Sequence, residues 1–467
     1  MNREKLFQID SIINSKSVAI VGASGSPGKV GRMFMDRYME AGCRAIYPIN
    51  PRENEILGFK AYARVADIPH PVDLVHILLP PKAVVGVLKE CIEKGVRGVI
   101  VTSAGFGLEG EDVLKQEQEL VRAAREKNVR IIGPNCLGIY CPANHLPFPL
   151  GPAMNRGSIG IVTQSGSFGD LLTKIATENG VYFSKAISCG NEADLNAVDF
   201  LEYLGEDQDT RIILAYLEGI RDGRRFYQAA KEISRKKPIL AWKCGASEAG
   251  ATAAASHTGA MAGSRHVWKG VFDGSGIIEI NSLEEALDCL YMFNSQPLPR
   301  GKRVAVVTGP GGPAVGTVDA CCELGLIVPK LQNETVEKIK TIIPPFGSSP
   351  QNPVDLSIAA IEMPEMYGDV IRLIDKDDHV DMIIVIGLGG DKFCRTIIKA
   401  AEEIHKPIAI AAIHPLEIVA QDYKTLLSRG IPIYTDPKRC ANALAKLAAY
   451  AEFRRRWEDF PIANTAI

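Results

Sequence analysis

A single histidine in a long run of small residues has the clearest capacity for covalent chemistry in this sequence. Residues 245–260 place His257 among glycine, alanine, serine and threonine, which offer little side chain for packing. An imidazole displayed on such an adaptable segment can act as a nucleophile or as a phosphoryl carrier. The alternative is a solvated loop histidine, and the residues of this segment leave both interpretations open.

Two glycine-rich turns, Gln164–Ser167 and Gly309–Gly312, favour the phosphoryl interpretation. Each follows a β-branched apolar run and precedes a segment of helical composition. Backbone N–H groups and the positive end of a helix favour a phosphate at such turns. The candidate phosphate-binding residues are therefore Ser165, Gly166, Ser167, Gly309, Gly311 and Gly312.

Glu218 follows the apolar run Ile212–Leu217 and is a candidate partner for the imidazole. A carboxylate that accepts a hydrogen bond from Nδ1–H fixes the tautomer and leaves Nε2 to attack phosphorus. The alternative is a surface glutamate at the end of a strand, which spacing alone leaves open.

A third glycine-rich turn, Gly22–Gly31, follows the run Ser17–Val21 and would let backbone N–H groups approach a pyrophosphate. It is not a Walker A loop, because Val30 stands where the Mg²⁺-binding hydroxyl belongs. The next expected strand, residues 44–49, ends in Asn50-Pro51-Arg52, without the acidic residue that holds a ribose diol. A ligand with phosphate on its ribose is then easier to accommodate, and coenzyme A and NADP both fit. A turn that only packs a helix on a strand is the alternative.

The elements that must position these turns repeat at domain-sized intervals. The three openings begin at Val18, Ile159 and Val304, which are 141 and 145 residues apart. Short apolar runs between amphipathic stretches predict an α/β fold with three consecutive doubly wound parallel-sheet domains of the Rossmann or flavodoxin-like kind. We place these domains at residues 1–148, 149–298 and 299–467. Further expected strands are Leu74–Leu79, Gly98–Thr102, Arg130–Ile132, Arg211–Tyr216, Pro238–Trp242, Ile277–Ile280, Met382–Ile386, Pro407–Ala411 and Ile431–Tyr434, and two expected helices are Lys82–Lys94 and Glu111–Lys127.

Composition excludes several classes of protein. The chain has 467 residues and a net charge of −2, which argues against nucleic acid or an anionic membrane as a partner. No stretch approaches the roughly 20 uncharged apolar residues that span a bilayer. The 11 scattered cysteines form no zinc pattern, and a charged start (Met1–Lys5) without an apolar segment behind it predicts no signal peptide. We expect a cytoplasmic protein without a bound metal.

Five motifs occur in an order that resembles a known family. They are Val21–Gly28, Gly133–Gly138, Thr163–Ser167, Ser256–Ala260 and Thr308–Gly312. Together they resemble the α subunit of ADP-forming acetyl-CoA synthetase, in the succinyl-CoA synthetase superfamily, over nearly the whole chain. One departure concerns the substrate: succinate-specific members carry an aromatic residue shortly after the second turn, where this chain has Gly169-Asp170. That difference weakens succinate as the substrate.

The resemblance implies a role for each motif. In this family the first domain binds coenzyme A. The residues that match its binding residues are Ser24, Gly25, Ser26, Pro27, Asn50, Pro51, Pro80, Ser103, Ala104, Asn135 and Cys136, and the last two lie near the thiol end of coenzyme A. His257 matches the phosphorylated histidine, and Glu218 matches the carboxylate that steadies it. Gly166 and Gly311 match the starts of two helices that receive the phosphohistidine.

The implied reaction is acyl-CoA + ADP + phosphate ⇌ acid + ATP + coenzyme A, through an acyl phosphate and a phosphohistidine. No ATP-grasp domain is visible in the sequence, so a separate β subunit is expected to hold ADP or ATP with Mg²⁺ in an α₂β₂ assembly. There are two alternatives. An NADP-dependent oxidoreductase leaves His257 unused, and a CoA-sensing regulatory module would not need it.

Overall fold

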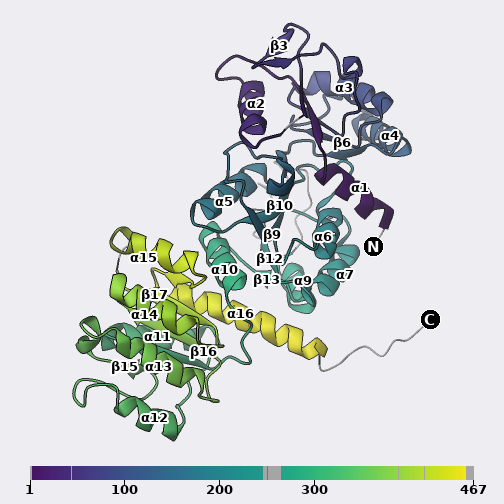
Figure 1. The fold of residues 1–467 in the computed structure, drawn as a ribbon. Helices are drawn as coiled ribbons and strands as arrows, with labels where there is room; N and C mark the ends of the chain where they lie inside the picture. Colours follow the sequence, from purple (N-terminus) through teal and green to yellow (C-terminus); the bar gives the residue numbers. More distant parts are fainter. Residues whose placement is uncertain are drawn as a thin grey trace. The chain divides into compact units, whose positions relative to one another are not determined.

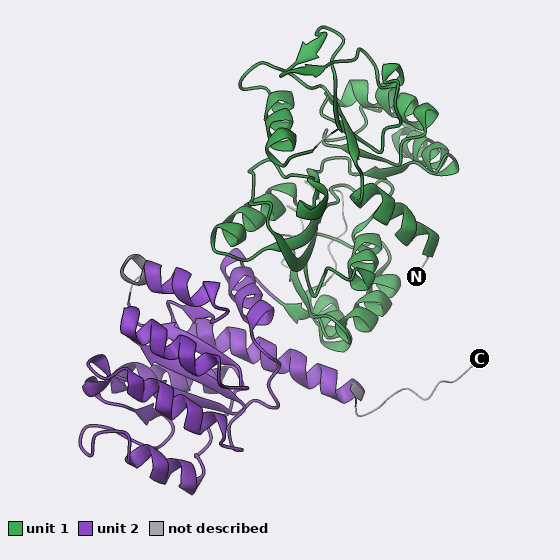
Figure 2. Cartoon of the chain, in the orientation of Figure 1, with its two compact units in different colours: residues 1–279 green, residues 280–467 purple. Residues whose placement is uncertain are grey.

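The computed structural model describes residues 3–43, 45–245, 250, 264–387, 389–414 and 416–458. The chain forms two compact units, residues 1–279 and 280–467 (Figure 2). In the described residues, unit 1 holds two large sheets and a two-stranded one, and unit 2 holds one large sheet (Figure 1). The predicted α/β class with doubly wound parallel sheets is confirmed, whereas the domain limits at 148 and 298 stay predictions.

The first sheet of unit 1 is parallel throughout and has the order β2-β1-β5-β6-β7. Its strands are β1 (Ser17–Val21), β2 (Ala45–Ile49), β5 (Leu74–Ile77), β6 (Gly98–Val101) and β7 (Arg130–Ile132). Its helices are α1 (Arg3–Ile13), α2 (Val30–Glu40), α3 (Pro81–Lys94) and α4 (Val113–Glu126), and β3 (Glu55–Ile56) pairs with β4 (Phe59–Lys60) in a small hairpin.

Every residue of β1 is buried, because its side chains alternate between two helical layers. Val18 and Ile20 belong to the core that contains α1 and α2. Ala19 and Val21 belong to the core that contains α3 and α4. An uninterrupted apolar run is therefore what this strand needs.

The second sheet of unit 1 has the order β13-β12-β11-β9-β10-β8. Its strands are β8 (Gly138–Tyr140), β9 (Arg156–Thr163), β10 (Phe183–Ser188), β11 (Ile212–Leu217), β12 (Ile239–Lys243) and β13 (Ile278–Glu279), and only β8 pairs antiparallel. The helices are α5 (Gly166–Glu178), α6 (Ala197–Glu206), α7 (Gly223–Ser234) and α9 (Arg265–Ser275). The core with α1 and α2 continues into this sheet and α6, so the two sheets share one apolar interior.

Unit 2 repeats the design with a parallel sheet of order β15-β14-β16-β17-β18. Its strands are β14 (Val304–Thr308), β15 (Val354–Asp355), β16 (Met382–Gly387), β17 (Ile408–Ala412) and β18 (Ile433–Tyr434). Its helices are α10 (Leu283–Ser295), α11 (Gly311–Glu323), α12 (Asn333–Lys340), α13 (Glu365–Asp375), α14 (Asp391–Ala401), α15 (Leu416–Ser428) and α16 (Pro437–Glu458). The side chains of α12, α13 and α14 pack on one face of this sheet.

The sequence patterns do not predict strands β3, β4, β8, β10 and β15, and β10 shows one reason. Three of its buried residues are polar, Ser184, Lys185 and Ser188. Ser184 donates to the carbonyl of Ile159 at 3.1 Å, and Lys185 pairs with Asp207 at 2.7 Å. Because tertiary partners satisfy these groups, the strand lacks the apolar pattern that marks its neighbours. Among the described residues, no helix combines the length and apolar composition needed to cross a membrane.

Candidate functional site

The residues that match the coenzyme A motifs lie together at one edge of the first sheet. Ser24–Pro27, Asn50–Pro51, Pro80, Ser103–Ala104 and Asn135–Cys136 follow the carboxyl ends of β1, β2, β5, β6 and β7. Hydrogen bonds join neighbouring turns: the Asn50 amide donates to the carbonyl of Ala23 at 3.0 Å, and the N–H of Asn135 donates to the carbonyl of Ser103 at 2.6 Å. This edge is the usual ligand position in open α/β sheets.

The Gly22–Gly31 turn is built around a close approach of backbone to backbone. A Cβ on Gly31 would lie 2.0 Å from the carbonyl oxygen of Gly22, which itself has φ +90°. Nothing lies within 4 Å of a Cβ placed on Gly28, and the nearest atom to one on Gly25 is Oε2 of Glu53 at 3.7 Å. Gly22 and Gly31 thus bring strand and helix together. Gly25 and Gly28 leave the turn open to a ligand.

Glu53 is a carboxylate that was not predicted at this turn. Asn50 Nδ2 donates to Glu53 Oε1 at 3.1 Å, and the guanidinium of Arg32 donates to the carbonyl of Gly25 at 2.7 Å. An acidic group therefore does reach the turn, from a few residues beyond the end of β2. The sequence signal was Glu53 itself, displaced from the position where a ribose-binding acid normally stands.

The thiol of Cys136 faces the protein interior. Its side chain is buried, and Sγ lies 3.5 Å from the carbonyl oxygens of Val101 and Ile132. Burial raises the pKa of this thiol to about 12, so the thiolate does not form near neutral pH. Asn135, with φ +59°, turns the chain beside it.

Ser165, Gly166 and Ser167 form the start of α5 in the second sheet. Ser165 Oγ accepts a hydrogen bond from the N–H of Phe168 at 3.4 Å, and Thr163 Oγ1 donates to the carbonyl of Ser165 at 2.6 Å. A Cβ on Gly166 would lie 2.8 Å from Cγ of Leu137. The start of α5 therefore contacts the turn that contains Asn135 and Cys136.

Glu218 lies on a buried turn directly after β11, held by its backbone. Gln164 Oε1 accepts hydrogen bonds from the N–H groups of Glu218 at 2.5 Å and of Gly219 at 3.0 Å. The ammonium of Lys243 donates to the carbonyl of Glu218 at 2.8 Å, and burial lowers the pKa of this lysine. Gln164 and Lys243 were not predicted to hold this turn, because their partners come from other strands.

Gly169 and Asp170 have packing roles that explain the departure noted in the sequence. A Cβ on Gly169 would lie 2.7 Å from Cγ2 of Thr163, so an aromatic side chain has no room there. Asp170 is buried and accepts a hydrogen bond from the N–H of Leu150 at 3.0 Å. Burial raises the pKa of Asp170 to about 6.

The third turn, Gly309–Gly312, repeats the second one in unit 2. Thr308 Oγ1 donates to the carbonyl of Pro310 at 2.7 Å, as Thr163 does for Ser165. A Cβ on Gly311 would lie 2.6 Å from Oδ2 of Asp355, whereas one on Gly312 meets nothing within 4 Å. The negative charge of Asp355 beside the start of α11 disfavours a free anion there. The sequence patterns do not predict a carboxylate at this position.

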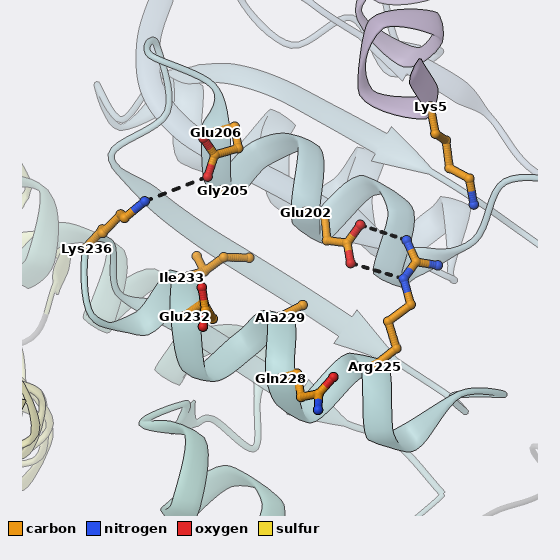
Figure 3. A pocket seen from close by; sticks show the side chains of 10 residues that line it. All are labelled: Lys5, Glu202, Gly205, Glu206, Arg225, Gln228, Ala229, Glu232, Ile233 and Lys236. Carbon is orange, nitrogen blue, oxygen red and sulfur yellow. Dashed lines mark hydrogen bonds and ion pairs between the residues drawn. The ribbon is translucent and has the colours of Figure 1, made fainter. Parts of the chain in front are cut away.

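His257 lies outside the described residues, so its position relative to Glu218 and Gly166 stays a prediction. In the described part of the chain, no group of three or more His, Cys, Asp or Glu side chains could hold a metal ion. A groove of about 560 Å³ between α6 and α7 is lined by charged side chains that pair with each other, as in the ion pair between Arg225 and Glu202 at 2.7 Å (Figure 3). The charged side chains of this groove pair with one another, whereas a catalytic site needs polar groups that converge on a ligand.

Three segments of the chain match known protein families. Residues 16–142 match a CoA binding domain, residues 156–293 match a succinyl-CoA ligase like flavodoxin domain, and residues 304–450 match a ligase-CoA domain. The α subunit of acetate–CoA ligase [ADP-forming] II from Pyrococcus furiosus is 38% identical over 95% of this chain and 98% of its own length. The chain belongs to the ADP-forming acetate–CoA ligase family.

Two further members show how far the likeness extends. The dinucleotide-forming acetyl-coenzyme A synthetase 1 of Ca. Korarchaeum cryptofilum, solved in complex with phosphate and ADP, superposes with a TM-score of 0.88 at 32% identity and covers 98% of this chain and 99% of its own. Acetate–CoA ligase [ADP-forming] I of Archaeoglobus fulgidus is 36% identical over 95% of this chain but only 64% of its own length. The predicted family and enzyme class, an ADP-forming acid–thiol ligase, are confirmed.

Proposed function

We propose that this chain is the α subunit of an ADP-forming acyl-CoA synthetase that acts on acetyl-CoA or a related thioester. A phosphate oxygen attacks the thioester carbonyl carbon, the C–S bond breaks, and coenzyme A leaves as a thiolate. His257 Nε2 then attacks the phosphorus of the acyl phosphate, and the carboxylate leaves. Finally a β-phosphate oxygen of ADP attacks the phosphohistidine, the N–P bond breaks, and ATP forms.

The carboxyl edge of the first sheet supports coenzyme A as the ligand of that domain. Ser24–Pro27 would lie against the pyrophosphate, since Gly25 and Gly28 leave space for close approach. Asn50, Pro51, Pro80, Ser103 and Ala104 would line the same ligand, and Asn135 would lie near its thiol end. When bound, coenzyme A supplies the thioester, whose carbonyl phosphate attacks.

The contact between Gly166 and Leu137 supports the proposal, because the start of α5 lies beside the turn that contains Asn135 and Cys136, which we call the thiol-end turn. The N–H groups of Gly166 and Ser167 and the hydroxyl of Ser165 would bind phosphate there, next to the bond that it attacks. Glu218 would accept a hydrogen bond from Nδ1–H of His257 and leave Nε2 toward phosphorus. His257 would have to serve two sites, and the composition of residues 245–260, rich in glycine, alanine and serine, suits this role.

The second site would lie at the start of α11, with Gly309, Gly311 and Gly312 around the phosphoryl group. The carboxylate of Asp355 beside Gly311 makes this helix end less favourable to a lone anion than α5. We therefore assign resting phosphate to α5 and only the transferred phosphoryl group, in company with the cation that accompanies the nucleotide, to α11.

An ATP-grasp β subunit would bind ADP or ATP and would supply most of the contacts to Mg²⁺. The Pyrococcus furiosus relative is itself named a subunit alpha, and the Archaeoglobus fulgidus relative is longer than this chain. We propose an α₂β₂ assembly in the cytoplasm.

Radioactive labelling tests the phosphohistidine. Labelled ATP with Mg²⁺ and the β subunit should leave an acid-labile, base-stable label on this chain. Labelled phosphate with acetyl-CoA should give the same label without nucleotide. His257→Ala should lose both labels and turnover but keep its affinity for coenzyme A. ATP synthesis by this variant would instead show direct transfer from acyl phosphate to ADP.

A further inference from the structure

Gln164 uses every hydrogen-bonding position of its side-chain amide. Oε1 accepts from the N–H groups of Glu218 and Gly219, and Nε2 donates to the carbonyl of Gly219 at 2.8 Å and to Oε1 of Glu192 at 2.9 Å. The orientation of the amide follows from these partners, because backbone N–H groups require an acceptor and the carbonyl and carboxylate require donors. With 8% of its surface exposed, Gln164 is shielded from competing water.

Glu192 is a buried carboxyl group on the turn between β10 and α6. Only 5% of its surface is exposed, and its backbone adopts φ +59°, which is uncommon for a residue with a side chain. Its Oε1 accepts hydrogen bonds from Gln164 Nε2 and from the N–H of Ala197 at 2.8 Å. The strained backbone and the buried carboxyl group together direct this side chain toward Gln164.

The backbone on either side of Glu192 binds the thiol-end turn of the first domain. The N–H of Asn191 donates to the carbonyl of Pro134, and the N–H of Ala193 donates to the carbonyl of Gly133, both at 2.9 Å. Gly190 makes this approach possible, since a Cβ there would lie 2.3 Å from the carbonyl oxygen of Pro134. The backbone of this turn therefore binds Gly133 and Pro134 of the first domain, and its Glu192 side chain binds Gln164.

We propose that Gln164 and Glu192 are positioning residues that hold the Glu218 turn in register with the thiol-end turn at Gly133–Asn135. Hydrogen bonds run without a break from the carbonyls of Gly133 and Pro134, through the Glu192 turn and the Gln164 amide, to the N–H of Glu218. This inference rests on the proposed function, in which acyl phosphate forms at one end of the chain of bonds and His257 receives phosphate at the other.

The consequence is a rate effect on one half of the reaction. Transfer from acyl phosphate to His257 needs the Glu218 carboxylate and the thiol-end turn at a fixed separation, and small displacements of reacting groups are costly. Phosphorylation of His257 by ATP takes place at the nucleotide site and does not use this separation. A residue needed only for folding would affect both halves alike.

Gln164→Glu is the diagnostic variant. It keeps the shape of the side chain and an acceptor for Glu218, but it removes the donor to Glu192 and to the carbonyl of Gly219, and it sets two carboxylates against each other. In the reconstituted αβ enzyme, labelling of His257 from acetyl-CoA and labelled phosphate should slow by about 10- to 100-fold, by analogy with the loss when a hydrogen-bond partner of a metal ligand is removed. Labelling from ATP should stay within about twofold of wild type, and coenzyme A affinity should be unchanged.

The reciprocal variant Gln164→Glu/Glu192→Gln tests whether the two residues act through each other. The new amide at position 192 would donate to the new carboxylate at position 164 and still accept from Ala197, so the bond between the two positions is restored with its direction reversed. We expect it to recover at least about tenfold of the lost rate. Gln228→Glu is the matched control, because Gln228 is exposed on α7 in the groove of Figure 3; it should behave as wild type.

Three outcomes would overturn the inference: equal losses from both phosphate donors, wild-type rates in Gln164→Glu, or no recovery in the reciprocal variant. Failure of the proposed function looks different, because wild-type enzyme would then form no acid-labile label from either donor.

Discussion

Gly166 and Leu137 touch at the junction between the two sheets of unit 1. The first residue of α5 stands so close to this leucine that a Cβ on it would lie 2.8 Å from Leu137 Cγ. The N–H of Leu137 is held in turn by Ser188 Oγ at 3.1 Å. The absence of a side chain at residue 166 therefore sets the distance between the start of α5 and the turn that contains Asn135 and Cys136.

Gly166→Ala should displace one of these two elements. We expect labelling of His257 from acetyl-CoA and phosphate to fall by about tenfold or more, and the variant to lose about 1–3 kcal/mol of stability from overpacking. Leu137→Ala should restore most of the rate when combined with it, since space is returned on the other side of the contact. Labelling reactions of both variants, quenched after set times, measure the rate of phosphorylation of His257. A double variant as slow as Gly166→Ala would contradict the steric explanation.

Glu218→Gln should leave the fold intact and slow phosphorylation of His257. The backbone N–H of residue 218 keeps its bond to Gln164, but the imidazole loses its anionic partner as positive charge develops on it. Losses of up to about 10⁴-fold occur for the comparable change in a catalytic triad, which sets an upper guide. Glu206→Gln, at an exposed position on α6, is the control. Unchanged labelling kinetics in Glu218→Gln would remove this carboxylate from the mechanism.

The chain without its partner should bind coenzyme A but neither ADP nor ATP. Gly25→Val should weaken coenzyme A binding sharply, since a β-branched side chain on the open turn blocks approach of the pyrophosphate to the backbone. Gly86→Val, on the exposed face of α3, makes the same substitution away from this turn and should bind normally. Calorimetric titration of each variant decides the matter. Binding of ADP without binding of coenzyme A would refute the assignment of this domain.

Asp170 should make the stability of unit 1 depend on pH. Burial raises the pKa of its carboxyl group to about 6, against the opposing charges of Arg37 and Lys174. The folded protein then holds this proton more tightly than the unfolded chain, so stability falls as pH rises from about 4 to about 6 and stays low above that. Asp170→Asn keeps an acceptor for the N–H of Leu150 without the charge.

The Asp170→Asn variant should therefore gain about 1–3 kcal/mol at pH 8 and progressively less toward pH 5. Urea denaturation of both proteins at pH 5 and pH 8 measures the difference. A gain of the same size at both values would show that the effect comes from packing and not from ionisation.

Most of the fold follows from local sequence patterns. Uninterrupted apolar runs such as Val18–Val21 predict strands because parallel strands are covered on both faces, and each glycine turn marks the start of a helix. The exceptions have partners that are distant in sequence. β10 escapes prediction because of Ser184 and Lys185, whose polar groups are satisfied by residues of other elements.

The α/β class, the family and the grouping of coenzyme A motifs at one sheet edge follow from the residues alone, because they depend on short segments and on parallel strands ending together. How that edge meets the start of α5 is visible only in three dimensions. The contact of Gly166 with Leu137, and the hydrogen bonds from Gly133 through Glu192 and Gln164 to Glu218, join residues as much as 85 positions apart. Such bonds depend on distance and direction in space, which no local pattern of residue types encodes.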